Sequence, residues 1–299
     1  MLKYRFLLIL TAAIWGFAFV AQTVAMDDIG PLTFSACRSF VGAASLLPVL
    51  LRHTPAPPLR PRAFSKSAAV FIAGCFLCGG TVFQQIGLVY TTASKASFIT
   101  ATYILLVPLF GLFFGSILRR NHVIGAVLAM SGVYFLTVTE SFTIGAGDAL
   151  IFLCALCFTG HILYLDYASQ RYDPVEIAAG QFFVCGCLSL AGALLFESIR
   201  WDAILAAGPS ILYVGVLSSG VAYTLQIIGQ RHLPPMECSM LLSLEMVFGG
   251  LSGVLVLGES MTARECLGVV LMTLGVFWSQ LPSRPVLHLS GIRFPHLSH

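Results

Sequence analysis

Two charged residues lie well inside stretches of this 299-residue sequence that are otherwise almost free of charge, and both side chains could do chemistry there. Arg38 is the interior charge of residues 31–51, and Glu245 is the interior charge of residues 236–257. If these stretches cross a bilayer as helices, each charge near the centre costs about 2.5–3.5 kcal/mol, so such residues usually face a cavity or a partner. At 1.5 Å per residue, Arg38 lies roughly 10 Å from one end of its helix, and Glu245 lies roughly 14 Å from an end, near mid-membrane.

Each charge has a chemical and a structural interpretation. The Arg38 guanidinium could bind a substrate carboxylate, or it could hold backbone carbonyls and neighbouring helices together. Glu245 could carry a proton or anchor an amine, or it could be a hydrogen-bonded structural acid. Two interior charges of opposite sign fit a zwitterion such as an amino acid, which is a hypothesis.

Uncharged side chains could complete a binding or proton-coupling site. His161 lies inside the apolar stretch 149–165 and could take part in proton coupling, although it could equally be a hydrogen-bonded buried imidazole. Asp166 follows five residues later, about 140° around a helix, so the two do not form a ligand pair. The residues that could line a cavity, or else bond neighbouring helices, are Trp15, Gln22, Gln84, Gln85, Tyr103, Gln181, Tyr223 and Gln226. The predicted substrate-binding residues are Trp15, Arg38, Gln84, Tyr103, Gln226 and Glu245, and the predicted proton-coupling residues are Glu245 and His161.

Motifs for metals, nucleotides and hydrolysis do not appear in the sequence. The pairs Cys75/Cys78 and Cys154/Cys157 have CxxC spacing, but no histidine cluster accompanies them, and a zinc site would need four ligands. We interpret them as packing residues in apolar helices. There is no GxxxxGK[ST] loop and no HExxH motif, and nothing supports a serine-type intramembrane enzyme. The sequence therefore predicts no cofactor, no metal, no nucleic-acid partner, no ATPase partner and no enzymatic activity.

The composition shows which elements must position these residues. Apolar residues make up 58% of the chain and charged residues 10%, with a mean hydropathy of +0.91, whereas a soluble domain carries about 25% charged residues. A helix needs about 20 residues to cross the hydrocarbon core, and ten stretches approach or exceed that length. They are residues 6–26, 31–51, 67–94, 96–118, 121–139, 149–165, 177–196, 203–230, 236–257 and 266–283. We therefore expect an all-α integral membrane protein with ten transmembrane helices, because these stretches lack the alternation of a barrel.

The basic residues separate by side when ten crossings are assumed. Twelve of the sixteen fall on the side of the N-terminus, while Lys95, Arg200 and Arg264 fall on the other side and Arg38 stays in the membrane. By the positive-inside rule, both termini are expected in the cytoplasm.

The two halves of the sequence resemble each other. Residues 123–135 (VIGAVLAMSGVYF) align with residues 266–278 (CLGVVLMTLGVFW), and Pro31 aligns with Pro174, both at an offset of 143. Gln84 aligns with Gln226 at an offset of 142. Because five helices per half is an odd number, the second half enters the membrane from the opposite side, as in secondary transporters. We expect two inverted five-helix repeats at 1–140 and 141–281, followed by an unstructured polar cytoplasmic tail at 282–299.

These features together resemble the drug/metabolite transporter superfamily, in its EamA-type branch. The elements that carry the resemblance are Trp15-Gly16, the spacing Pro31…Arg38, YILLVPLFGLFFG (103–115) and SLEMVFGGLSGVLVLGESMTARECLGVVLMTLGV (243–276). One departure is Glu245-Met246, where the family usually has Glu-Pro, so a kink there is not assured, while Pro108 provides for one in the first half.

The resemblance implies a secondary transporter that moves a small metabolite, with export of an amino acid or a related compound as the expectation. It implies a multi-pass protein of the plasma membrane (the bacterial inner membrane), monomeric or homodimeric, without an ATPase. An uptake permease and a channel-like facilitator remain alternatives, and an intramembrane enzyme is a more distant one.

Overall fold

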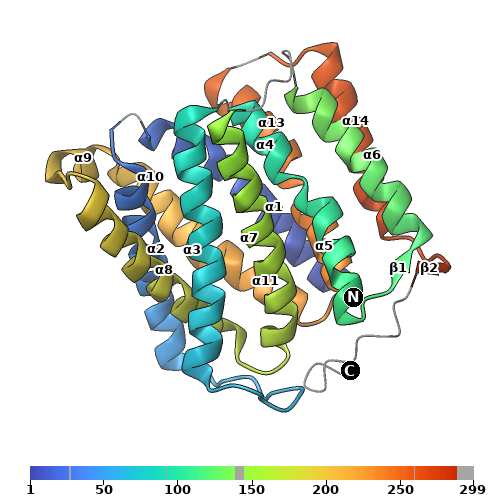
Figure 1. The fold of residues 1–299 in the computed structure, drawn as a ribbon, viewed down its shortest axis with the longest axis horizontal. Helices are drawn as coiled ribbons and strands as arrows, with labels where there is room; N and C mark the ends of the chain where they lie inside the picture. Colours follow the sequence, from blue (N-terminus) through green and yellow to red (C-terminus); the bar gives the residue numbers. More distant parts are fainter. Residues whose placement is uncertain (27, 92, 139–144, 259, 288–299) are drawn as a thin grey trace.

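A computed structural model describes residues 1–26, 28–91, 93–138, 145–258 and 260–287, and these form a bundle of helices (Figure 1). The first half comprises α1 (Leu2–Ala25), α2 (Pro31–Arg52), α3 (Lys66–Tyr90), α4 (Ala93–Thr100), α5 (Tyr103–Gly111), the 3₁₀ turn η1 (Leu112–Phe114), β1 (Leu118–Arg119) and α6 (Arg120–Thr137). The second half comprises α7 (Ala146–Ser169), α8 (Pro174–Phe196), α9 (Trp201–Ala206), α10 (Gly208–Leu212), the π-helix η2 (Tyr213–Ala222), α11 (Tyr223–Gln230), α12 (Pro235–Leu242), α13 (Glu245–Leu257), α14 (Ala263–Ser279) and β2 (Pro285–Leu287). We call the end of the bundle where α1 begins and α14 ends the termini face, and the opposite end the far face.

Helix starts follow from local sequence. Pro31 and Pro174 occupy the first turns of α2 and α8, where a missing N–H costs nothing and the fixed φ suits the helix. Asp173 caps α8 through bonds from the backbone N–H groups of Val175 and Glu176. Thr262 caps α14 in a capping box with Glu265.

Eight helical segments among the described residues are long and apolar enough to cross a membrane, by length and composition alone. They are Leu2–Ala25, Pro31–Arg52, Lys66–Tyr90, Ala96–Phe114, Ala146–Ser169, Pro174–Phe196, Gly208–Gln230 and Pro235–Val256. The remaining two expected spans correspond to α6 and α14, which have 18 and 17 residues.

Helices from the two halves pack against each other in pairs. α2 packs on α8, α3 on α7, α1 on α13, and α6 on α14 (Figure 1). Glycines bring α6 and α14 together: a Cβ at Gly132 would lie 2.4 Å from Met272 N, and one at Gly275 would lie 2.5 Å from Ala129 N. Such backbone-to-backbone approach is how small residues join membrane helices without a hydrophobic driving force.

Two of the expected transmembrane helices are broken at equivalent places. The first is interrupted at Ala101–Thr102, between α4 and α5, and the second at Ser243–Leu244, between α12 and α13. The Thr102 hydroxyl donates to Ile99 O at 2.6 Å, and the Ser243 hydroxyl donates to Met240 O at 2.7 Å, so side chains satisfy carbonyls near each break. The second break therefore forms without the proline that is usual in the family. The first lies before Pro108, which is accommodated inside α5.

The segment that follows the last long helix is partly structured. β2 pairs antiparallel with β1, and Arg120 N donates to Arg284 O. The expectation of an unstructured tail from residue 282 is wrong for residues 285–287, because a strand partner is available beside the start of α6; residues 288–299 lie outside the described residues.

Candidate functional site

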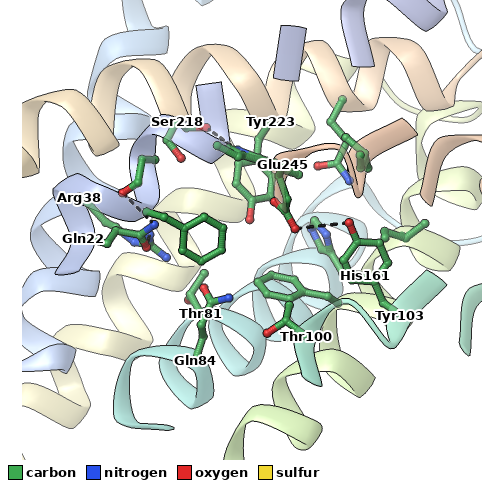
Figure 2. Close-up of a pocket in the computed structure, with 17 residues that line it drawn as sticks. Gln22, Arg38, Thr81, Gln84, Thr100, Tyr103, His161, Ser218, Tyr223 and Glu245 are labelled. Atoms are coloured by element: carbon green, nitrogen blue, oxygen red, sulfur yellow. Dashed lines mark hydrogen bonds between the residues drawn. The ribbon is translucent and has the colours of Figure 1, made fainter. Parts of the chain in front are cut away.

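A cavity of about 60 Å³ lies where the two broken helices meet (Figure 2). A volume of this size holds a few water molecules or a small ligand. Its walls combine aromatic and aliphatic side chains with polar and charged ones, and polar groups that converge on a cavity are typical of a small-molecule site. The lining residues are Trp15, Ala18, Phe19, Gln22, Arg38, Thr81, Gln84, Thr100, Tyr103, Phe158, His161, Ile162, Ser218, Tyr223, Gln226, Leu242 and Glu245.

Glu245 begins α13 directly after the second break and points into this cavity. Its side chain is 8% exposed, and Oε1 accepts a long hydrogen bond of 3.4 Å from the Tyr103 hydroxyl. A carboxylate at the first turn of a helix is favoured by the helix dipole. Glu245 forms no ion pair among the described residues, so most of its acceptor capacity is directed at the cavity.

Arg38 supplies the positive charge of the site from α2. Its Nη1 donates to Gln22 Oε1 at 2.7 Å, and the same oxygen accepts from Gln85 Nε2 at 2.8 Å. The guanidinium is 5% exposed, has no ion pair in the described parts of the chain, and its Nε has no hydrogen-bond partner there. A buried charge is stable only when it is paired or well hydrogen-bonded, so Arg38 still lacks a negative partner.

His161 and Trp15 are each held by a neighbour. His161 Nε2 lies 2.9 Å from Gln181 Oε1, and the imidazole is 1% exposed. Trp15 Nε1 donates to Ser218 O at 3.3 Å, within the π-helix η2, and the indole packs on Tyr223 with ring centroids 4.6 Å apart. A π-helix at this point agrees with the frequent use of such segments at functional sites.

The structure brings every predicted site residue to this one cavity. Trp15, Arg38, Gln84, Tyr103, His161, Gln226 and Glu245 all line it, as do Gln22 and Tyr223. Gln85 and Gln181 instead stand behind the wall, where they hold Gln22 and His161. Whether these residues bind or couple stays a prediction.

Sequence reasoning missed several lining residues, and the repeat spacing could have found three of them, Phe158, Ala18 and Thr81, as the equivalents of Trp15, His161 and Tyr223. Most lining residues form pairs separated by the repeat offset of 142 or 143. The pairs are Trp15/Phe158, Ala18/His161, Phe19/Ile162, Thr81/Tyr223, Thr100/Leu242, Tyr103/Glu245 and Gln84/Gln226. Equivalent positions of the two halves therefore face the same space, and the two side chains differ in every pair except Gln84/Gln226.

The CxxC pairs do not assemble a metal site. Cys78 faces α8, with its Sγ 3.7 Å from Ser189 Oγ, while Cys75 is exposed. Within the described ranges, no group of three or more His, Cys, Asp or Glu side chains could hold a metal ion.

The fold and this cavity define a membrane transporter, and the chain belongs to the EamA-like transporter family, whose sequence profile matches it twice, over residues 2–138 and 145–280. An uncharacterized transporter of Archaeoglobus fulgidus is 33% identical over 270 residues, which are 90% of this chain and 83% of that protein. The threonine/homoserine exporter RhtA of Escherichia coli K12 is 27% identical over 155 residues, about half of each chain. A crystal structure with 19% sequence identity superposes with a TM-score of 0.79 over 93% of this chain and 96% of its own, which supports the fold.

Proposed function

We propose that the protein is a secondary transporter that exports a small amino acid or a related zwitterion by alternating access. The observation that carries this proposal is the pair Arg38 and Glu245. They line one buried cavity, and neither forms an ion pair in the described parts of the chain. A ligand with one carboxylate and one ammonium group would supply both missing partners. Charges exposed to water would need no ligand to compensate them, whereas the two buried charges of Arg38 and Glu245 do.

The proposed architecture has ten crossings arranged as two inverted five-helix repeats, 1–140 and 141–281. The double match of the family profile supports two repeats. The packing of α6 on α14 supports counting these two helices as spans, because their glycine seam resembles close packing between membrane helices. The two breaks support a transport site near mid-membrane, since discontinuous helices form such sites in secondary transporters.

The proposed location is the bacterial plasma membrane, with both termini in the cytoplasm. The termini face carries the basic residues of the 53–65 connector, Arg60 and Arg62, and those of the β1 region, Arg119 and Arg120. The positive-inside rule assigns such a face to the cytoplasm.

The proposed substrate class and direction draw support from RhtA, which is named as a threonine/homoserine exporter. In our proposal the substrate carboxylate meets Arg38 and its ammonium meets Glu245. Figure 2 shows Arg38 with Gln22 at one side of the cavity and Tyr103 with His161 at the other, with Glu245 between. The enclosed volume favours a small side chain.

We further propose that Glu245 and His161 couple transport to protons. Both line the cavity, and Glu245 could bind either the ammonium group or a proton, which would make export and proton entry exclusive of each other. Gln181 holds the His161 ring in place at 2.9 Å.

Flux into proteoliposomes tests the proposal. Vesicles loaded with an unlabelled small zwitterion such as threonine should accumulate external labelled threonine by saturable counterflow. A proton gradient directed opposite to the movement of threonine should increase this accumulation. Uptake coupled in the opposite sense would indicate a permease. Unsaturable ohmic current would indicate a channel, and chemical conversion of the compound would indicate an enzyme.

A further inference from the structure

Two larger hollows flank the central cavity, one toward each face of the bundle. The hollow at the far face has a volume of about 360 Å³ and lies among α1, α4, α6, α13 and the start of α14. The hollow at the termini face has a volume of about 890 Å³ and lies among the starts of α1, α6 and α12 and the ends of α7, α11 and α14.

The wall between the cavity and the far-face hollow is thin. Phe19 lines both spaces, and Met246, the residue next to Glu245, lines the far-face hollow. Phe19 is thus the one residue that lines both the cavity and this hollow among those described.

The wall toward the termini face is thicker. The cavity and the termini-face hollow share no lining residue among those described. Ile162, which lines the cavity, and Leu233, which lines the hollow, belong to one buried apolar cluster that also contains Leu8, Ile104 and Leu241. Close-packed apolar side chains of this kind exclude polar solutes.

Phe19 and Ile162 occupy equivalent positions in the two halves, 143 residues apart. α1 runs from the termini face to the far face, so Phe19 lies on the far side of Trp15. α7 runs the other way, so Ile162 lies on the termini side of Phe158, the residue equivalent to Trp15. The inverted geometry therefore gives Ile162 the same relation to the termini face that Phe19 has to the far face.

One hydrogen bond makes the two walls unequal. Gln230 Nε2 donates to Ile162 O at 3.0 Å, and the Gln230 side chain is buried beside the termini-face hollow. The equivalent of Gln230 at the offset that relates Gln84 to Gln226 is Leu88, which has no donor. Among the described residues, the one side chain that donates to Phe19 O is Thr23 of the same helix, at 3.0 Å. A buried amide bond to a membrane-helix carbonyl resists opening, whereas α13 holds α1 through a longer bond from the Ser252 hydroxyl to Gly16 O, at 3.4 Å.

We infer that Phe19 and Ile162 are the two gates of one cavity, and that the hydrogen bond from Gln230 holds the Ile162 gate closed. In the described state, packed apolar side chains close the cavity toward the termini face, and Phe19 closes it toward the far face. Substrate reaches the far-face hollow when the Phe19 ring moves aside. It reaches the termini-face hollow when the Gln230 bond breaks and α7 and α11 separate. This inference rests on the proposed transport function and assigns its access routes to named residues.

A labelling experiment tests the gates without any substrate. Thr100→Cys places a thiol in the cavity wall, and mass spectrometry of the peptide that contains residue 100 separates its signal from those of the nine native cysteines. A charged, membrane-impermeant methanethiosulfonate is added either to right-side-out or to inverted vesicles.

In the Thr100→Cys background, Phe19→Ala should raise the labelling rate from the far face by about tenfold or more and leave the termini-face rate unchanged. Gln230→Leu, which keeps the side-chain volume and removes the donor, should raise only the termini-face rate. Phe158→Ala is the matched control, because it removes a ring of equal size that lines the cavity but neither hollow. Monodisperse elution from a sizing column shows that each variant is folded.

The inference is overturned if Phe19→Ala and Phe158→Ala raise far-face labelling equally, or if Gln230→Leu leaves termini-face labelling at the parent rate. Because labelling needs no transport, loss of the gates and loss of the proposed transport function are separate results. The more conservative Phe19→Leu should give an intermediate far-face rate, so a folding defect in the alanine variant leaves the test intact.

Discussion

Replacing Glu245 with glutamine should weaken the binding of a small zwitterion by about 10- to 150-fold. Glutamine keeps the volume of the side chain and keeps an acceptor for the Tyr103 hydroxyl, so the break between α12 and α13 should persist. What disappears is the charged partner of the ammonium group. A hydrogen bond to a charged group contributes about 1.5–3 kcal/mol, and each 1.4 kcal/mol is a factor of ten in affinity.

The burial of the site supports the upper part of that range. Glu245 is 8% exposed in a small enclosed cavity, so solvent screens its charge weakly. Its one hydrogen bond in the described structure is the long one from Tyr103, so the carboxylate is not committed elsewhere.

Isothermal titration of the purified protein in detergent provides the assay. Two ligands are compared: threonine and the matching dihydroxy acid, in which a hydroxyl replaces the amine. Glu245→Gln should weaken threonine and leave the hydroxy acid nearly unchanged. Tyr103→Phe, the control, removes only a neutral hydroxyl and should cost less than about tenfold. Equal affinity of wild type and Glu245→Gln for threonine, or an equal loss for both ligands, would refute this assignment.

Three further predictions follow from the structure. Arg38→Gln should weaken threonine but not the corresponding amino alcohol, which lacks the carboxylate, as the same titration would show; equal losses for the two ligands would contradict a carboxylate contact. Gly132→Leu should lower the melting temperature or prevent folding, because its Cβ alone would lie 2.4 Å from Met272 N and overpacking typically costs about 1–3 kcal/mol or more. Val127→Leu, at an exposed position of the same helix, is the control. An unchanged melting temperature of the Gly132 variant would contradict the close packing of α6 on α14. Burial would raise the pKa of Asp173, but bonds from Ala56 N–H and His53, among others, hold that pKa below its ordinary value of 3.8. The stabilisation by Asp173 is therefore present above pH 3.8 and lost as the pH falls through the lowered pKa. Asp173→Asn should melt at a lower temperature than the wild type at neutral pH and lose less stability on acidification, and equal acid sensitivity of the two proteins would contradict this.

The sequence predicted the long apolar helices well, because hydropathy depends on composition and not on tertiary contacts. The helices α1, α2, α3, α7 and α8 coincide with expected stretches to within a few residues. It singled out Arg38 and Glu245, which line the cavity, because a charge in an apolar stretch is costly; their roles stay a prediction.

Other features depend on contacts that no local pattern encodes. The break at Ser243–Leu244 forms without a proline, and the Ser243 hydroxyl bonds to Met240 O beside it. Gln181 could not be distinguished from a lining residue, since only its distance to His161 shows that it lies behind the wall. The pairing of β2 with β1 joins segments about 170 residues apart in a polar tail, and the tail itself carries no signal for a strand.

Counterflow tests the central claim most directly. Proteoliposomes with the wild-type chain, preloaded with unlabelled threonine or another small zwitterion, should take up the labelled compound transiently above equilibrium, with a rate that saturates. Empty vesicles should not, and vesicles with Glu245→Gln should need about 10- to 150-fold more substrate to reach the same rate. Uptake that rises linearly with concentration and does not depend on internal substrate would contradict a carrier with one alternately exposed cavity.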